Sequence, residues 1–166
     1  MDELTEDDRS VAEGARRTNA AGALAALGAC PALDRVTTLA RLGLRVDISL
    51  ISVAVGDRLF YKSVAGAGAP FTDPEGLPIA GAPCGHVVMA ERPFVVEDMS
   101  GGLDGAPALN AYFGAPLRAP GGEVLGCLCA MARSARAWTP DDLTIMRHLA
   151  GLTEEAFARA LRVPGA

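Results

Sequence analysis

The chain has 166 residues, 50% of them hydrophobic, and a formal net charge of −5 at pH 7. This length suits one domain, which buries roughly two-thirds of the surface that its unfolded form exposes. Affinity for nucleic acids comes largely from lysine and arginine side chains that neutralise phosphates, so we expect no nucleic-acid partner for this acidic chain.

The N-terminal stretch MDELTEDDRS is acidic and lacks the basic flank and apolar block of a signal peptide. Apolar windows elsewhere are broken by Arg, Gly and Pro well short of the ~20 residues that span a bilayer. We therefore expect a cytoplasmic protein with no membrane partner. In a reducing cytosol its four cysteines are expected to be free, buried thiols: Cys30, Cys84, Cys127 and Cys129.

Two helices are predicted near the N-terminus. Residues 1–10 form a charged lead that we expect to be flexible, and the alanine-rich residues 11–29 predict the first helix. Pro31 favours the first position of a second helix, because its missing N–H is not needed there. The apolar stripe of this second helix recurs at helical spacing over Leu33, Val36, Thr37, Ala40 and Leu44.

The pattern then changes to that of strands. VDISLISVAV and RLFYKSVAG, linked by Gly56-Asp57, predict a hairpin. Residues 66–83 are rich in Pro and Gly and predict a long irregular connection. CGHVVMAE predicts two helical turns, FVVED a short strand, and AYFGAPLRA with EVLGCLCAMA two further strands.

A long helix is predicted at the C-terminal end. In WTPDD, Thr139 is placed to cap the helix, Pro140 takes its first position, and Asp141 and Asp142 favour its positive end. The helical pattern continues to about Arg162. Strands that lie between helical ends indicate an α+β architecture, with an antiparallel sheet and helices on its faces.

Three stretches in this order resemble the GAF domains of signalling proteins over roughly residues 21–162. They are ALDRVTTLARLGLRVDISLISVAVGDRLFYKS, PCGHVVMAERPFVVED, and YFGAPLRAPGGEVLGCLCAM followed by RAWTPDDL. The resemblance implies a GAF-like antiparallel sheet of about six strands, with the terminal helices packed on one face and a ligand pocket on the other. It implies one GAF-like domain over residues 11–162, followed by a C-terminal tail over 163–166.

The resemblance also implies a function. Such domains are non-enzymatic sensory or regulatory modules of bacterial signal transduction, which bind a small molecule or a protein partner and form homodimers through their terminal helices. We therefore assign no catalytic residue and expect no cofactor. By analogy, the residues that contact a ligand are Phe60, Cys84, His86, Met99 and Tyr112, although ordinary core packing is an equal alternative for Phe60 and Tyr112.

A zinc site is one alternative for the cysteines. Cys84, His86, Cys127 and Cys129 would supply three thiolates and one imidazole, but structural sites usually separate paired ligands by two to four residues, and one residue separates each pair here. We expect no metal site. Cys127 and Cys129 on one strand would have Cβ atoms roughly 6.5 to 7 Å apart, too far for a disulfide, so we expect both to share an apolar layer with Leu125 and Met131.

Two further functions belong to relatives of the GAF family. GAF photoreceptors attach a bilin to a cysteine that histidine follows directly, whereas Gly85 separates Cys84 from His86 here. A GAF-like family reduces free methionine sulfoxide through clustered cysteines, and Cys84 resembles one of them. No other cysteine lies between residues 85 and 126, so we expect no resolving thiol near Cys84.

Overall fold

The computed structural model describes residues 6–66, 71, 73–99 and 109–162, and the expected tail over 163–166 lies outside this part. None of its helices combines the length and the hydropathy that a membrane-spanning segment needs. The elements in chain order are α1 (Glu6–Ala26), α2 (Pro31–Leu44), β1 (Ile48–Val55), β2 (Arg58–Ala65), β3 (Leu77–Pro78), α3 (Pro83–Ala90), β4 (Phe94–Val96), β5 (Ala111–Arg118), β6 (Val124–Ala132) and α4 (Pro140–Arg162).

The strands form one six-stranded antiparallel sheet in the order β3-β2-β1-β6-β5-β4. The predicted hairpin is confirmed as β1 and β2, and the predicted α+β class is confirmed as well. Strand β3 was not expected. It has two residues, which pair with Arg58 and Leu59, and so short a strand shows no alternation of polar and apolar residues.

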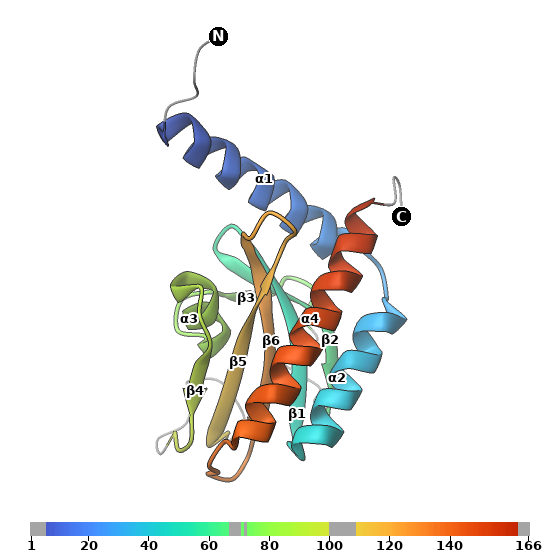
Figure 1. Ribbon diagram of the computed structural model, residues 1–166, viewed down its shortest axis with the longest axis vertical. Helices are drawn as coiled ribbons and strands as arrows, with labels where there is room; N and C mark the ends of the chain where they lie inside the picture. Colours follow the sequence, from blue (N-terminus) through green and yellow to red (C-terminus); the bar gives the residue numbers. More distant parts are fainter. Residues whose placement is uncertain (1–5, 67–70, 72, 100–108, 163–166) are drawn as a thin grey trace.

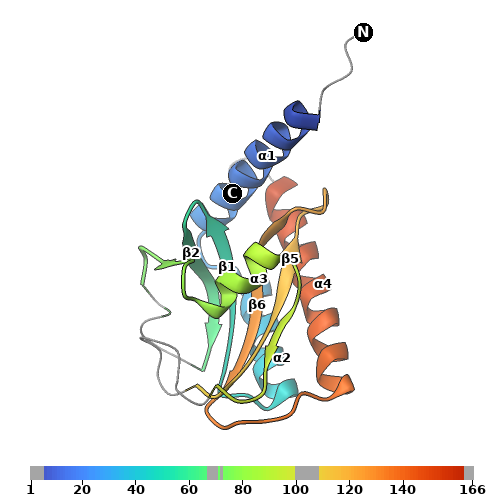
Figure 2. The ribbon, with the colours of Figure 1, turned by 90° about the vertical axis from the view of Figure 1, so that its left-hand side faces the viewer.

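Helices cover both faces of the sheet. Helices α2 and α4 lie side by side on one face, called here the helix face, while α3 lies on the other (Figures 1 and 2). The C-terminal half of α1 packs near the end of the helix face, and its N-terminal half extends away from the sheet (Figure 1). Because both faces are covered, β6 is buried at all nine positions and β1 at all but Val55.

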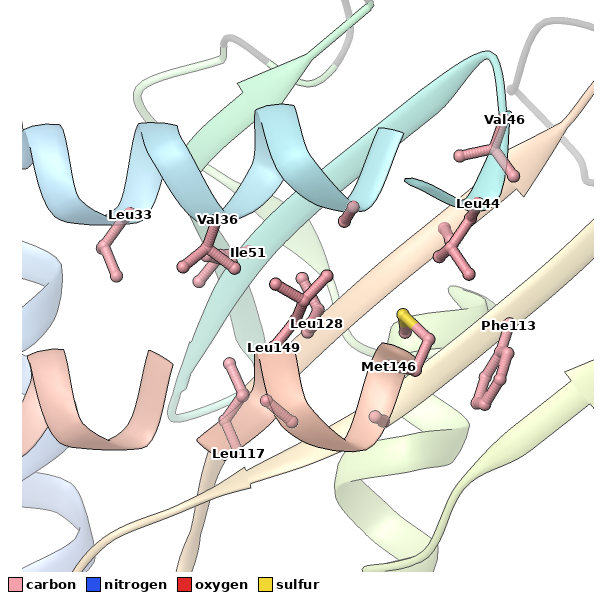
Figure 3. Packing of buried hydrophobic residues seen from close by; sticks show 14 of the residues in the cluster. Leu33, Val36, Leu44, Val46, Ile51, Phe113, Leu117, Leu128, Met146 and Leu149 are labelled. Carbon is pink, nitrogen blue, oxygen red and sulfur yellow. The ribbon is translucent and has the colours of Figure 1, made fainter. Parts of the chain in front are cut away.

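The core of the helix face confirms the predicted stripe of α2. Figure 3 shows Leu33, Val36 and Leu44 of α2 facing the sheet beside Met146 and Leu149 of α4. All five side chains are buried, and each contributes about 1.5–3 kcal/mol by leaving water. The strand residues labelled in the same view are Ile51, Phe113, Leu117 and Leu128.

The start of α4 is fixed by the predicted cap. Thr139 Oγ1 accepts a hydrogen bond from the backbone N–H of Asp142 at 3.2 Å, and the Asp142 carboxylate accepts one from the N–H of Thr139 at 2.9 Å. Arg136 joins this cap to α2, because its guanidinium pairs with Asp142 at 2.7 Å and also donates to the Leu44 carbonyl. The other end of the chain differs from expectation, since α1 begins at Glu6.

Lys62, the one lysine of the chain, caps the C-terminal end of α1. The pairing of β1 with β2 shifts between Ile51 and Ser52, which leaves Lys62 as the extra residue of a β-bulge. Its Nζ donates hydrogen bonds to the carbonyls of Ala25, at 3.0 Å, and Leu27. The ammonium therefore satisfies carbonyl groups at the negative end of α1.

We predict that Lys62→Met lowers the free energy of unfolding by about 1–2 kcal/mol, because the substitution removes charge-assisted hydrogen bonds to the end of α1. Chemical denaturation measures the effect. Arg159→Met is the control, since the Arg159–Glu155 pair is exposed and its loss should change the same quantity by less than about 0.5 kcal/mol. Equal effects of the two substitutions would contradict this role of Lys62.

Candidate functional site

A second apolar layer lies on the face of the sheet that α3 covers, called here the thiol face. Cys127, Cys129 and Met131 of β6 point into it, as expected. Leu125 does not: it belongs to the helix face, and Val124 joins the thiol face instead. The reason is a register shift beside Leu117 and Arg118, which pair with Gly126 and Val124 and leave Leu125 as an extra residue.

Three cysteines and one tyrosine meet in the middle of this layer. The Sγ atoms of Cys84 and Cys129 are 2.8 Å apart, and those of Cys127 and Cys129 are 3.1 Å apart. Tyr112 Oη lies 3.0 Å from the sulfur of Cys129, 3.4 Å from that of Cys84 and 3.7 Å from that of Cys127. We call these four residues the thiol–tyrosine cluster, and none is more than 4% exposed.

Glycine at position 114 lets the tyrosine reach the sulfurs. Tyr112 pairs across the sheet with Met131, while Gly114, two residues further along β5, pairs with Cys129. A Cβ atom on Gly114 would lie 2.4 Å from Tyr112 Oη and 2.6 Å from a methyl carbon of Val87. The phenol ring therefore occupies the space that a side chain at position 114 would need.

The electrostatics of the cluster favour one thiolate, on Cys84. Hydrogen bonds from the thiols of Cys127 and Cys129, and from the hydroxyls of Tyr112 and Ser52, lower the pKa of Cys84 well below its ordinary value, although burial opposes them. Cys84 also stands in the first turn of α3, where the helix N-terminus favours negative charge. Burial raises the pKa of Cys127, Cys129 and Tyr112.

The expectation that Cys84 has no thiol near it is wrong. Separation along the chain hid the contact, because Cys84 lies on α3 while Cys127 and Cys129 lie on β6, and α3 packs directly on β5 and β6. The alternation Cys-x-Cys in a strand was the available signal. This spacing places both sulfurs on one face of the sheet. The sequence does not show that α3 covers that same face, so the contact with Cys84 could not be inferred.

The other residues expected to contact a ligand lie around the cluster or apart from it. His86 is exposed, with its ring 5.2 Å from that of Phe94, which in turn lies 5.8 Å from Tyr112. Met99 is half-buried against the same layer. Phe60 pairs with Val53, a residue of the helix face, so its position on β2 belongs to the face opposite the cluster.

A groove of about 320 Å³ opens on the helix side, between α4 and the strands β4 and β5. Its wall is mostly apolar but carries Arg147 and Glu154. The pocket expected from the resemblance would lie on the other face. Residues 67–70, 72 and 100–108, which precede and follow α3 in the sequence, lie outside the described residues, so that pocket stays a prediction.

Gly85 lets the start of α3 pack against Ile79, in the segment that leads into the helix. A Cβ atom at this position would lie 2.1 Å from the carbonyl oxygen of Ile79, far inside any real contact. Position 85 therefore has no room for a side chain. A histidine directly after Cys84, the arrangement of bilin-binding GAF domains, does not fit this backbone.

We predict that Gly85→Ala lowers the free energy of unfolding by more than about 2 kcal/mol, because the added methyl group meets backbone atoms that cannot move aside cheaply. Thermal and chemical denaturation measure the change. Gly22→Ala in α1 is the matched control: no atom lies within 4 Å of its added Cβ, and alanine should raise stability by about 0.5–1 kcal/mol. Similar results for both variants would disprove the tight docking of α3.

A family model for the GAF domain matches residues 31–157, so this protein belongs to the GAF family. No curated protein sequence matches the chain significantly.

Several solved structures share the fold. The GAF domain of the Acinetobacter phosphoenolpyruvate-protein phosphotransferase has 17% identity and a TM-score of 0.69, over 81% of this chain and 84% of that chain. The free methionine-R-sulfoxide reductase of Neisseria meningitidis, solved with its substrate, has 18% identity and a TM-score of 0.65, over 78% and 77%. The second GAF domain of DevS from Mycobacterium smegmatis has 23% identity and a TM-score of 0.63, over 79% and 94%. At these identities the likeness establishes the fold alone.

Proposed function

We propose that this protein is a cytoplasmic, bacterial GAF module of signal transduction, which receives its input at the thiol–tyrosine cluster and acts as a homodimer through its terminal helices. The observation that supports this function is the position of the cluster relative to the helices. Cys127 and Cys129 alternate along β6 with Leu128, whose side chain packs on the helix face. A single layer of backbone therefore separates the input from α2 and α4.

The proposed mechanism is a shift between two arrangements of the helices. A change at the cluster that moves β6 alters the surface on which α2 and α4 rest, because packed layers repack in discrete steps. An input that favours one arrangement biases the equilibrium by its differential affinity, typically about 1–3 kcal/mol. A signalling partner then binds one of the two arrangements of the helices more tightly than the other.

Apolar side chains on the terminal helices support the dimer. Val11 of α1 is 73% exposed and Leu152 of α4 is 49% exposed. Exposed apolar side chains of this size become buried when two copies pack their helices together, and their burial favours association.

We predict that the protein is a dimer in solution and that the double variant Val11→Glu, Leu152→Glu is monomeric, because it brings like charges together in an apolar interface. Light scattering coupled to size exclusion measures the mass. Met89→Glu is the control: Met89 is 76% exposed but lies on α3, away from the terminal helices, and this variant should stay dimeric. A monomeric wild type, or a monomeric Met89→Glu variant, would refute this interface.

A second candidate function is thiol-dependent reduction of free methionine sulfoxide. The observation that favours it is the 2.8 Å separation between the sulfurs of Cys84, whose pKa is lowered, and Cys129. In this reaction Cys84 attacks the sulfoxide sulfur, the oxygen leaves as water with two protons, and Cys129 displaces methionine as the Cys84–Cys129 disulfide forms. An external dithiol then reduces the disulfide.

If this second candidate is correct, the protein turns over free methionine sulfoxide with a dithiol reductant, and Cys84→Ser loses at least about 1,000-fold of the activity, since the nucleophile is gone. Amino-acid analysis of the methionine formed measures the rate. Cys30→Ser should retain full activity, because Cys30 lies outside the cluster. Absence of turnover in the wild type, or equal activity in Cys84→Ser, would exclude this function.

A further inference from the structure

The thiol–tyrosine cluster has the composition of a metal site. The sulfur atoms of Cys84, Cys127 and Cys129 all lie within 4.8 Å of one another, and all three residues are buried. We propose that these three thiolates bind a zinc ion, an inference that rests on the proposed function because it names the input of the same cluster. Zinc is a metal for which thiolates are preferred ligands.

The spacing of the sulfurs suits a zinc ion. Zinc–sulfur bonds of about 2.3 Å in a tetrahedral arrangement separate the ligand sulfurs by about 3.8 Å. The two shortest sulfur–sulfur distances of the cluster are 2.8 and 3.1 Å. These two pairs need to spread by about 1 Å or less, and the third pair, no more than 4.8 Å apart, needs a change of similar size at most. Small rotations of the cysteine side chains supply such changes.

Charge favours a divalent ion at this position. Three sulfur atoms so close together repel one another through their lone pairs unless positive charge lies between them, and in the thiol form the S–H protons serve that purpose. A zinc ion takes the place of the protons that remain on the thiols, these protons pass to solvent, and the site of three thiolates and Zn²⁺ has a net charge of −1. A monovalent ion such as Cu⁺ would leave −2, which is costlier to bury.

Tyr112 fits a supporting role beside the metal. Its buried hydroxyl has the three sulfurs as hydrogen-bond partners, so it is placed to donate to a ligating thiolate. Three protein ligands leave one of the four zinc positions to a water molecule or a small ligand. The exposed His86, turned toward Phe94, takes no part in this set, which differs from the four-residue set weighed from the sequence.

The test uses the full chain, produced with zinc in the medium and purified under reducing conditions. Elemental analysis should find an equimolar amount of zinc. Replacement by Co²⁺ should give sulfur-to-cobalt charge-transfer absorption and the intense visible bands of a tetrahedral ion. In competition with a chromophoric chelator, Tyr112→Phe should weaken zinc binding by about 10- to 100-fold, and Cys127→Ser or Cys129→Ser should weaken it further still.

Cys30→Ser is the matched control and should bind zinc as the wild type does, because Cys30 packs against the helix-face core. Circular dichroism of each variant checks folding. If a cluster serine variant fails to fold, the thiolate bands of wild-type Co²⁺ protein and the affinity of Tyr112→Phe decide the matter. Wild-type protein without zinc and without thiolate bands would overturn the proposal, as would equal loss of zinc in Cys30→Ser and Cys129→Ser.

The zinc content, combined with the oligomeric state and the arrangement of the helices, separates this inference from the proposed function. Protein that is dimeric but holds no zinc overturns the metal site alone. Protein that holds zinc but shows the same helix arrangement with and without it, measured by spin-label distances between the two α4 helices, overturns the sensory role of the cluster.

Discussion

The close docking of α3 on β5 and β6 is the constraint on which the thiol face depends. Gly114 of β5 makes it possible, because Tyr112 and a methyl group of Val87 of α3 occupy the space that a side chain there would need. Gly85 in turn lets the start of α3 lie against the carbonyl of Ile79, just before the helix. The short distance brings Cys84 of α3 against the sulfur of Cys129. A wider separation would leave the same cysteines as unrelated parts of an apolar core.

The two faces of the sheet have different chemistry. On the helix face the buried hydroxyls have oxygen partners: Thr37 Oγ1 lies 2.8 Å from Ser63 Oγ, and Thr153 donates to the Leu149 carbonyl at 2.8 Å. On the thiol face the buried hydroxyl of Tyr112 lies among three sulfurs. A buried polar group costs free energy unless it is hydrogen-bonded, and the Tyr112 hydroxyl relies on weak sulfur partners. Such a group in the middle of a layer is better explained by a site than by packing alone.

Local patterns predicted the fold well. Apolar periodicity located α2, the turn residues located the β1–β2 hairpin, and the residues before α4 correctly predicted its cap. The alternation of faces along a strand gave a wrong prediction at a β-bulge, because one extra residue opposite Leu117 and Arg118 turns the side chain of Leu125 to the helix face. No local signal marks such a shift, since it depends on the partner strand.

The site was harder to predict than the fold. The family resemblance points to Cys84 and Tyr112, and both belong to the cluster, but the spacing of cysteines along the chain does not reveal the sulfur partners of Cys84. Phe60 was placed by its strand without knowledge of the face to which it points. A contact between α3 and β6 depends on tertiary packing, which neither spacing nor composition encodes.

The central claim is that three thiols form one buried site beneath α3. Alkylation of the folded protein, followed by mass spectrometry of each cysteine over time, tests it most directly. The account predicts that Cys84, Cys127 and Cys129 react slowly and at one shared rate, because a single opening of α3 uncovers all three, while the partly exposed Cys30 reacts early. Rapid alkylation of Cys84 at the rate of Cys30, with Cys127 and Cys129 still protected, would contradict it.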